Sequence, residues 1–170
     1  MVSPPAVGYE APNWPPSSWQ GLAKRRPVLF ALLIILAMML LKFPLVLPFT
    51  IAGYESTTDQ VMDVGIALAL ASFVILPLET LLGQTLPLWL SQRATWPWRI
   101  AVATVVFAVL HIPAGPIGVG VGIAGGIPLA FACLCWRPLG FWRAFGYTTF
   151  AHAGHNAIAF GIYLATQGME

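Results

Sequence analysis

Charged residues are so scarce in this chain that their placement limits what it can fold into. Only eight Lys and Arg and six Asp and Glu occur among 170 residues, a share of 8%, where soluble domains carry about 25%. These residues are clustered, and the apolar runs between the clusters are longer than a compact aqueous protein can hide. At ~20 residues for each span, the length allows about five transmembrane helices. The sequence therefore predicts an all-α fold, a polytopic helical membrane bundle.

Several classes of function lack the residues that they need. A net charge of +2 is too small for a basic nucleic-acid-binding face, so we expect no nucleic-acid partner. Cys133 and Cys135 have no second pair to complete a zinc or iron–sulfur ligand set, which favours a structural role and no metal or other cofactor. The chain also lacks the HExxH, GxSxG and P-loop motifs. Function is therefore expected inside the bilayer or at its edge.

The chain divides into an N-terminal tail and a transmembrane domain. Residues 1–23 carry five prolines and few large aliphatic side chains, which predicts a disordered, Pro-rich cytoplasmic tail. Residues 24–170 form the predicted transmembrane helical domain. Its apolar runs lie at residues 28–51, 61–90, 100–112, 117–135 and 145–166.

The basic residues predict the orientation of the bundle, because Lys and Arg of short loops stay on the cytoplasmic side. In a five-span arrangement all of them except Lys42 fall on one side: Lys24, Arg25, Arg26, Arg93, Arg99, Arg137 and Arg143. We therefore expect a multi-pass protein of the cytoplasmic or plasma membrane, with its N-terminus inside and its C-terminus outside. Lys42 interrupts the first span, where it either snorkels to the far interface or serves as a functional charge.

The fourth apolar run carries Gly118, Gly122 and Gly126 at intervals of four residues. This spacing places small residues along one helix face, where a second helix can approach closely. We therefore expect helix–helix packing at this face.

A few polar residues remain at depth once the loops and interfacial anchors are set aside: Glu79, Thr80, Gln84, His111, His152, His155 and Asn156. A carboxylate within a span costs about 2.5–3.5 kcal/mol, so it is expected to face a partner or a wet cavity. Depth can be counted from the nearest inner arginine at ~1.5 Å per residue. It is about 14–21 Å for these four residues: Glu79, His111, His152 and Asn156. Three helices thus offer a carboxylate, two imidazoles and an amide in one layer.

These side chains are suited to metal-independent hydrolysis of an amide bond. His152 and Asn156 are four residues apart and project from one helix face, so both can touch one ligand. A carboxylate such as Glu79 can take a proton from water as the water attacks a carbonyl carbon, while imidazole and amide N–H groups stabilise the oxyanion. His155 lies on a neighbouring face, where it either supports His152 or points elsewhere.

The spacing of these residues resembles the motifs of the CPBP family, the CAAX-protease and bacteriocin-processing (ABI) intramembrane endopeptidases. The family motifs are Glu-Glu-x-x-x-Arg, Phe-x-x-x-His and His-x-x-x-Asn/Asp. The matching segments occur in the same order, as LPLETLLGQ (76–84), FAVLH (107–111) and HAGHN (152–156). The resemblance covers residues 73–162, about half of the chain.

The resemblance implies a role for each matching residue. Glu79 and His111 would hold and activate the attacking water, and His152 with Asn156 would form the oxyanion site. Phe107 matches the aromatic position of the second motif. The implied substrate is a membrane-embedded or membrane-tethered peptide or protein within the lipid bilayer. With one carboxylate and two histidines, a metal site stays an alternative.

The first motif departs from the family pattern at Thr80 and Gln84, where the family has a second Glu and an Arg. Removing one partner of a buried ion pair costs about 3–5 kcal/mol, whereas replacing both can be neutral. Thr and Gln can still hydrogen-bond, so we interpret them as a compensated supporting pair.

Two other functions stay open beside the endopeptidase. Because the first motif departs from the family pattern, one alternative is that this chain is a catalytically inactive relative, which acts as a membrane binding, immunity or regulatory protein. A proton or ion pathway would also use intramembrane Glu and His, but the motif spacing would then be a coincidence.

Overall fold

The computed structural model describes residues 14–54 and 74–167, and all regular elements within these ranges are helices. The all-α prediction is confirmed for this part of the chain. The main helices are α1 (Ser17–Arg25), α2 (Pro27–Ile51), α5 (Leu86–Leu90), α6 (Trp96–Leu110), α7 (Gly115–Trp136) and α8 (Phe141–Gln167). Residues 74–80 are also helical and continue through a π-helical turn, η1 (Leu81–Thr85), into α5. Two 3-10 turns flank α7, namely η2 (Ile112–Ala114) and η3 (Arg137–Leu139).

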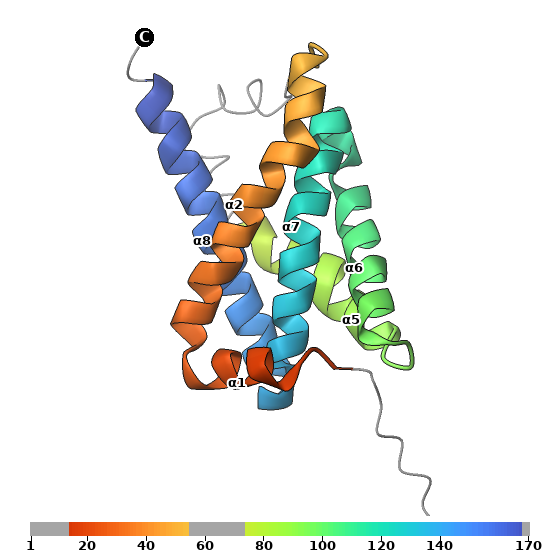
Figure 1. Ribbon diagram of the computed structural model, residues 1–170. Coiled ribbons are helices and arrows are strands. Elements are labelled where there is room, and N and C mark those ends of the chain that lie inside the picture. Colours follow the sequence, from red (N-terminus) through yellow and green to blue (C-terminus); the bar gives the residue numbers. More distant parts are fainter. Residues whose placement is uncertain (1–13, 55–73, 168–170) are drawn as a thin grey trace, which may run out of the picture.

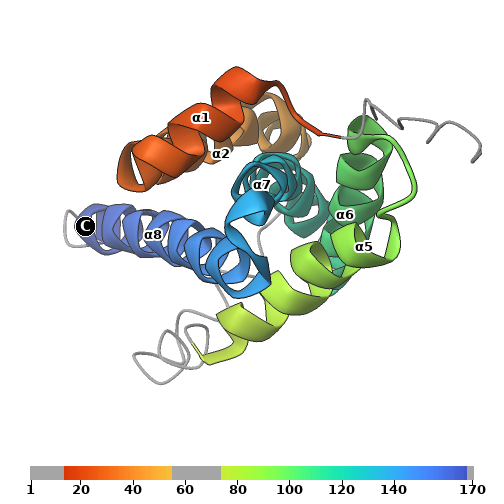
Figure 2. The ribbon, with the colours of Figure 1, turned by 90° about the horizontal axis from the view of Figure 1, so that it is seen from below.

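Helix α7 is the centre of the bundle (Figure 1, Figure 2). It contacts α1, α2, α6, α8 and η1. Most of its side chains are buried, and Leu129, Leu134 and Trp136 have no exposed surface. Glycine and alanine are frequent in its sequence, GPIGVGVGIAGGIPLAFACLCW. These short side chains let several helices approach the same backbone.

The expected packing face of α7 is confirmed against α6. A Cβ atom at Gly122 would lie 2.8 Å from Cα of Ala108, and one at Gly126 would lie 3.1 Å from Cα of Thr104. Both distances are shorter than ordinary van der Waals contacts. The α6 backbone therefore comes this close because these two positions lack a side chain.

Two helical stretches are long and apolar enough to cross a membrane, Pro27–Ile51 and Ile112–Leu139. The apolar stretches Val74–Leu90 and Trp96–Leu110 are shorter. The 15 residues of α6 extend about 22 Å at ~1.5 Å per residue, which is less than the ~30 Å of a bilayer core. Length and composition thus support two of the five predicted spans within the described residues. The first part of the second predicted span, residues 61–73, lies outside them.

The N-terminal region differs from the predicted disordered tail at residues 17–23. These residues are part of α1, and Ala23 has no exposed surface. The indole Nε1 of Trp136 donates a hydrogen bond to the backbone oxygen of Ala23 at 3.3 Å. The ring centroid of Trp19 lies 5.8 Å from that of Phe131 on α7. The prediction is wrong here because the prolines precede the helix and the apolar side chains find partners on α7. Residues 1–13 lie outside the described residues.

Basic residues gather at one end of the bundle, the lower end in Figure 1. Helix α1, the turn between α5 and α6, and the η3 turn all lie at this end. We call this end the basic end. It carries seven basic residues: Lys24, Arg25, Arg26, Arg93, Arg99, Arg137 and Arg143. The opposite end carries the C-terminal turns of α2 and α8 and the η2 turn.

Candidate active site

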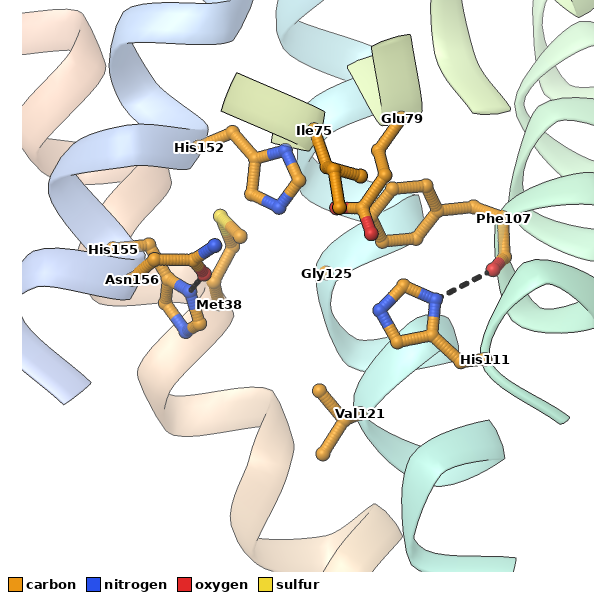
Figure 3. A pocket seen from close by; sticks show the side chains of 10 residues that line it. All are labelled: Met38, Ile75, Glu79, Phe107, His111, Val121, Gly125, His152, His155 and Asn156. Atoms are coloured by element: carbon orange, nitrogen blue, oxygen red, sulfur yellow. Dashed lines mark hydrogen bonds between the residues drawn. The ribbon is translucent and has the colours of Figure 1, made fainter. Parts of the chain in front are cut away.

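A cavity of about 210 Å³ lies between α2, α6, α7, α8 and the helical segment 74–80. At ~30 Å³ for each water, it has room for several water molecules. All four residues predicted to be catalytic line it, and so do two of the predicted supporting residues. Figure 3 shows the complete lining, which is Met38, Ile75, Glu79, Phe107, His111, Val121, Gly125, His152, His155 and Asn156.

Glu79 lies in the last helical turn before η1. Its side chain is partly buried, and its carboxylate points into the cavity towards His111 (Figure 3). The two groups are close enough to interact electrostatically. Glu79 is also the only Asp or Glu among the described residues. The structure thus brings together the acid and the histidine that the first two motifs contribute.

His111 ends α6 and turns its ring into the cavity. Its Nδ1 lies 2.8 Å from the backbone oxygen of Phe107. A carbonyl oxygen can only accept a hydrogen bond, so Nδ1 carries the proton and donates it. The neutral ring then presents Nε2 as an acceptor. A Cβ atom at Gly122 would lie 3.3 Å from Cγ of His111, so the ring position also depends on the close approach of α7.

The ring of Phe107 lies close to the imidazoles of both His111 and His152. Its centroid is 4.7 Å from that of His111 and 5.5 Å from that of His152. Phe107 is buried, and a Cβ atom at Gly83 would lie 2.5 Å from its Cδ2 atom. The π-helical turn can therefore pack directly against the phenyl ring, because Gly83 has no side chain. Phe107 supports the site by fixing the spacing of the two histidines.

Thr80 bonds to His152 and not to Gln84. The hydroxyl Oγ1 of Thr80 lies 3.1 Å from Nδ1 of His152, and both residues are buried. Thr80 precedes the π-helical turn, in which the backbone N–H of Leu86 bonds to the oxygen of Leu81, five residues earlier, and the hydroxyl of Thr85 donates to the backbone oxygen of Thr80 at 3.3 Å. Gln84 is fully buried, and its amide has no hydrogen-bond partner among the described residues. Thr80 and Gln84 therefore do not bond to each other, and the interpretation of their joint replacement as compensated stays a prediction.

His155 positions Asn156. Its Nδ1 lies 3.1 Å from Oδ1 of Asn156, and because an amide oxygen only accepts, the imidazole is the donor. The amide nitrogen of Asn156 is then left for the cavity, towards which it points in Figure 3. Of the two expectations for His155, a supporting role is the one that the geometry favours, although the residue that it supports is Asn156.

Lys42 lies one helical turn beyond Met38 on α2, and side chains four residues apart share a helix face. It is partly buried, and its ammonium group is close enough to His152 and His155 to interact with both electrostatically. Lys42 does not line the cavity, so both expectations for it stay predictions.

Comparison of the chain with protein-family models, with characterised proteins and with solved structures finds no match. The functional argument therefore rests on the residues around the cavity. In the two described ranges, no group of three or more His, Cys, Asp or Glu side chains is arranged to hold a metal ion. The metal alternative thus finds no ligand set in this part of the chain.

Sequence reasoning missed the parts of the site that depend on contacts between helices. Met38, Ile75 and Val121 line the cavity, but an apolar residue in an apolar run gives no signal of such a role. Gly83, which was also missed, does give a signal, because it is a glycine inside an apolar helix where a neighbouring ring can approach.

Proposed function

We propose that the protein is an intramembrane endopeptidase of the CPBP or CAAX-protease type, in which Glu79 activates a water that hydrolyses a peptide bond of a membrane-associated protein or peptide. One observation carries the proposal: an acid, three imidazoles and an amide from three helical segments line one cavity. The motif order resembles the family, and the cavity adds the spatial arrangement that this chemistry needs.

The proposed setting is a bundle of about five transmembrane helices, with the N-terminus and the basic end in the cytoplasm and the C-terminus outside. Two long apolar stretches and the gathering of basic residues at one end support this setting. Leu32, Leu36 and Leu40 add to the support, because they follow one face of α2 and are each more than half exposed. Such an apolar stripe is suited to contact with lipid.

In the proposed mechanism, a water molecule is held between the Glu79 carboxylate and Nε2 of His111. Glu79 takes a proton from this water as the water oxygen attacks the carbonyl carbon, which forms a tetrahedral oxyanion. The proton then passes to the leaving amine as the C–N bond breaks. The bond from His111 to the oxygen of Phe107 supports this role, because it places the proton of the neutral ring on Nδ1 and leaves Nε2 able to accept from water.

His152 and Asn156 supply the proposed oxyanion site. When the hydroxyl of Thr80 donates to Nδ1 of His152, the proton of the neutral ring is on Nε2, which becomes a donor. The oxygen of Asn156 accepts from His155, so its NH2 group donates into the cavity. Two positioned N–H donors are what a developing oxyanion requires.

A peptide-cleavage assay tests the proposal. Purified full-length protein in liposomes is incubated with a library of membrane-spanning and membrane-tethered peptides, and new chain ends are detected by mass spectrometry. We expect cleavage of a subset of peptides, and a loss of roughly 10²–10⁴-fold in rate for His111→Ala, the range typical of acid–base groups. Cleavage by His111→Ala at the wild-type rate, with an unchanged unfolding temperature, would show that this cavity is not the site.

A catalytically inactive relative is the second candidate function, and Gln84 is the observation that favours it. Its buried amide has no partner among the described residues, and the family's Glu and Arg charges are absent beside Glu79. The same library separates the two candidates. Saturable peptide binding without any cleavage, lost in Asn156→Ala, would support a binding, immunity or regulatory protein and overturn the endopeptidase.

A further inference from the structure

A groove of about 410 Å³ lies at the basic end, between the start of α2 and the first turns of α8. It is lined by Pro27, Val28, Arg143, Gly146, Tyr147 and Phe150, none of which lines the catalytic cavity. The α8 residues of the groove end at Phe150, and those of the cavity begin at His152. The groove is therefore distinct from the cavity.

The lining of the groove changes from charged to apolar along α8. Arg143 is exposed at the basic end, and Gly146, Tyr147 and Phe150 follow on the same helix face. From Arg143 to Phe150 the helix rises about 10 Å at ~1.5 Å per residue. A cation thus precedes an apolar strip, which is the order of head and tail in a phospholipid.

Arg143 in the groove and the three basic residues that precede Pro27 lack an acidic partner in the described part of the chain. Lys24, Arg25 and Arg26 are exposed and directly precede Pro27, which lines the groove beside Arg143. Glu79 is the only acid among the described residues, and it lines the catalytic cavity instead. An anionic group from outside these residues would complement four cations here.

We propose that this groove binds an anionic phospholipid of the cytoplasmic leaflet, with its phosphate at Arg143 and the preceding basic residues and one acyl chain along Gly146, Tyr147 and Phe150. Basic pockets between transmembrane helices on this side suit such headgroups. A zwitterionic lipid offers no net charge to the cations, and free phosphate offers no chain to the apolar strip. The inference goes beyond the proposed peptidase, because lipid occupancy is measured without turnover.

Native mass spectrometry of the full-length, delipidated protein in detergent tests the inference. The protein is titrated with palmitoyl-oleoyl phosphatidylglycerol, with phosphatidylcholine of the same chains, and with inorganic phosphate as a competitor. Arg143→Gln removes the cation, and Gly146→Leu fills the groove without a clash, since a Cβ atom there meets nothing within 4 Å. The matched controls are Arg93→Gln, an exposed cation outside the groove, and Gly161→Leu, an equally open glycine of α8.

We expect saturable binding of phosphatidylglycerol that is tighter than that of phosphatidylcholine. Arg143→Gln should weaken it about fivefold, the change for one basic residue near an anionic surface, and Gly146→Leu should weaken it as well, while both controls match the wild type. Equal affinity for the two lipids, an equal loss in Arg93→Gln, or full displacement by inorganic phosphate would each overturn the inference. Unfolding temperatures confirm that every variant is folded.

Discussion

The hydroxyl of Thr80 joins the first motif to α8 through His152, so it is a positioning group whose loss should be measurable. We predict that Thr80→Val lowers the turnover number of the proposed peptidase roughly tenfold, because a buried imidazole loses the partner that sets its tautomer. The KM should change little, since valine has nearly the same shape, while the free energy of unfolding should fall by about 1–3 kcal/mol because Nδ1 of His152 loses its partner. Thr80→Ser keeps the hydroxyl and should restore the rate.

Steady-state kinetics on one cleaved peptide checks this prediction. A Thr80→Val rate equal to that of the wild type would show that the bond to His152 has no part in catalysis. A loss that Thr80→Ser shares in full would point to packing as the cause.

At the scale of residues, the sequence predicts which side chains meet but not how they bond. Counting residues along straight helices places Glu79, His111, His152 and Asn156 in one layer, and all four line one cavity. The partner of Thr80 could not be predicted, because it is His152 of another helix, 72 residues away in the sequence. Local periodicity does not contain such a contact.

At the scale of elements, the contact of α6 with α7 holds the second motif in place. We predict that Gly122→Ala lowers the free energy of unfolding by about 1–3 kcal/mol, because the new methyl group would lie 2.8 Å from Cα of Ala108 and must push α6 away. His111 moves with α6, so peptide cleavage should fall as well. Denaturant unfolding in detergent measures the first effect.

Gly161→Ala is the matched control for this substitution. A Cβ atom at Gly161 of α8 meets nothing within 4 Å, so alanine should leave the stability unchanged or raise it by about 0.5–1 kcal/mol through helix propensity. Equal stability of the two alanine variants would contradict the account of α6 and α7 as a close glycine-mediated contact.

The extents of the long helices follow from the apolar runs, while the shorter elements do not. The predicted spans 28–51 and 117–135 correspond to Pro27–Ile51 and Gly115–Trp136, because a long apolar run is stable as a helix from end to end. Helix α1 could not be predicted, since its stability comes from contacts such as the bond of Ala23 with Trp136, more than a hundred residues away.

At the scale of the whole molecule, the gathering of basic residues at one end predicts the orientation in the membrane. We expect a reporter fused after Glu170 to be extracytoplasmic and one fused before Met1 to be cytoplasmic. Protease protection in spheroplasts or sealed vesicles measures both. A cytoplasmic reporter after Glu170 would contradict the five-span arrangement, because an odd number of spans places the two ends on opposite sides.

The number of spans is where sequence reasoning reaches its limit. Hydropathy treats every apolar run alike, but α6 is shorter than a bilayer core, and Val74–Leu90 contains a π-helical turn. Whether such helices span or insert part of the way depends on their neighbours, which no single run encodes.

The central claim is that Glu79 activates the water that attacks the peptide bond, and replacing its carboxylate by an amide tests this most directly. The rate of cleavage of one membrane peptide is measured for the wild type and for Glu79→Gln, a substitution that keeps the size of the side chain and removes the base. The account predicts a fall of roughly 10²–10⁴-fold with an unchanged unfolding temperature. Cleavage by Glu79→Gln at the wild-type rate would contradict it.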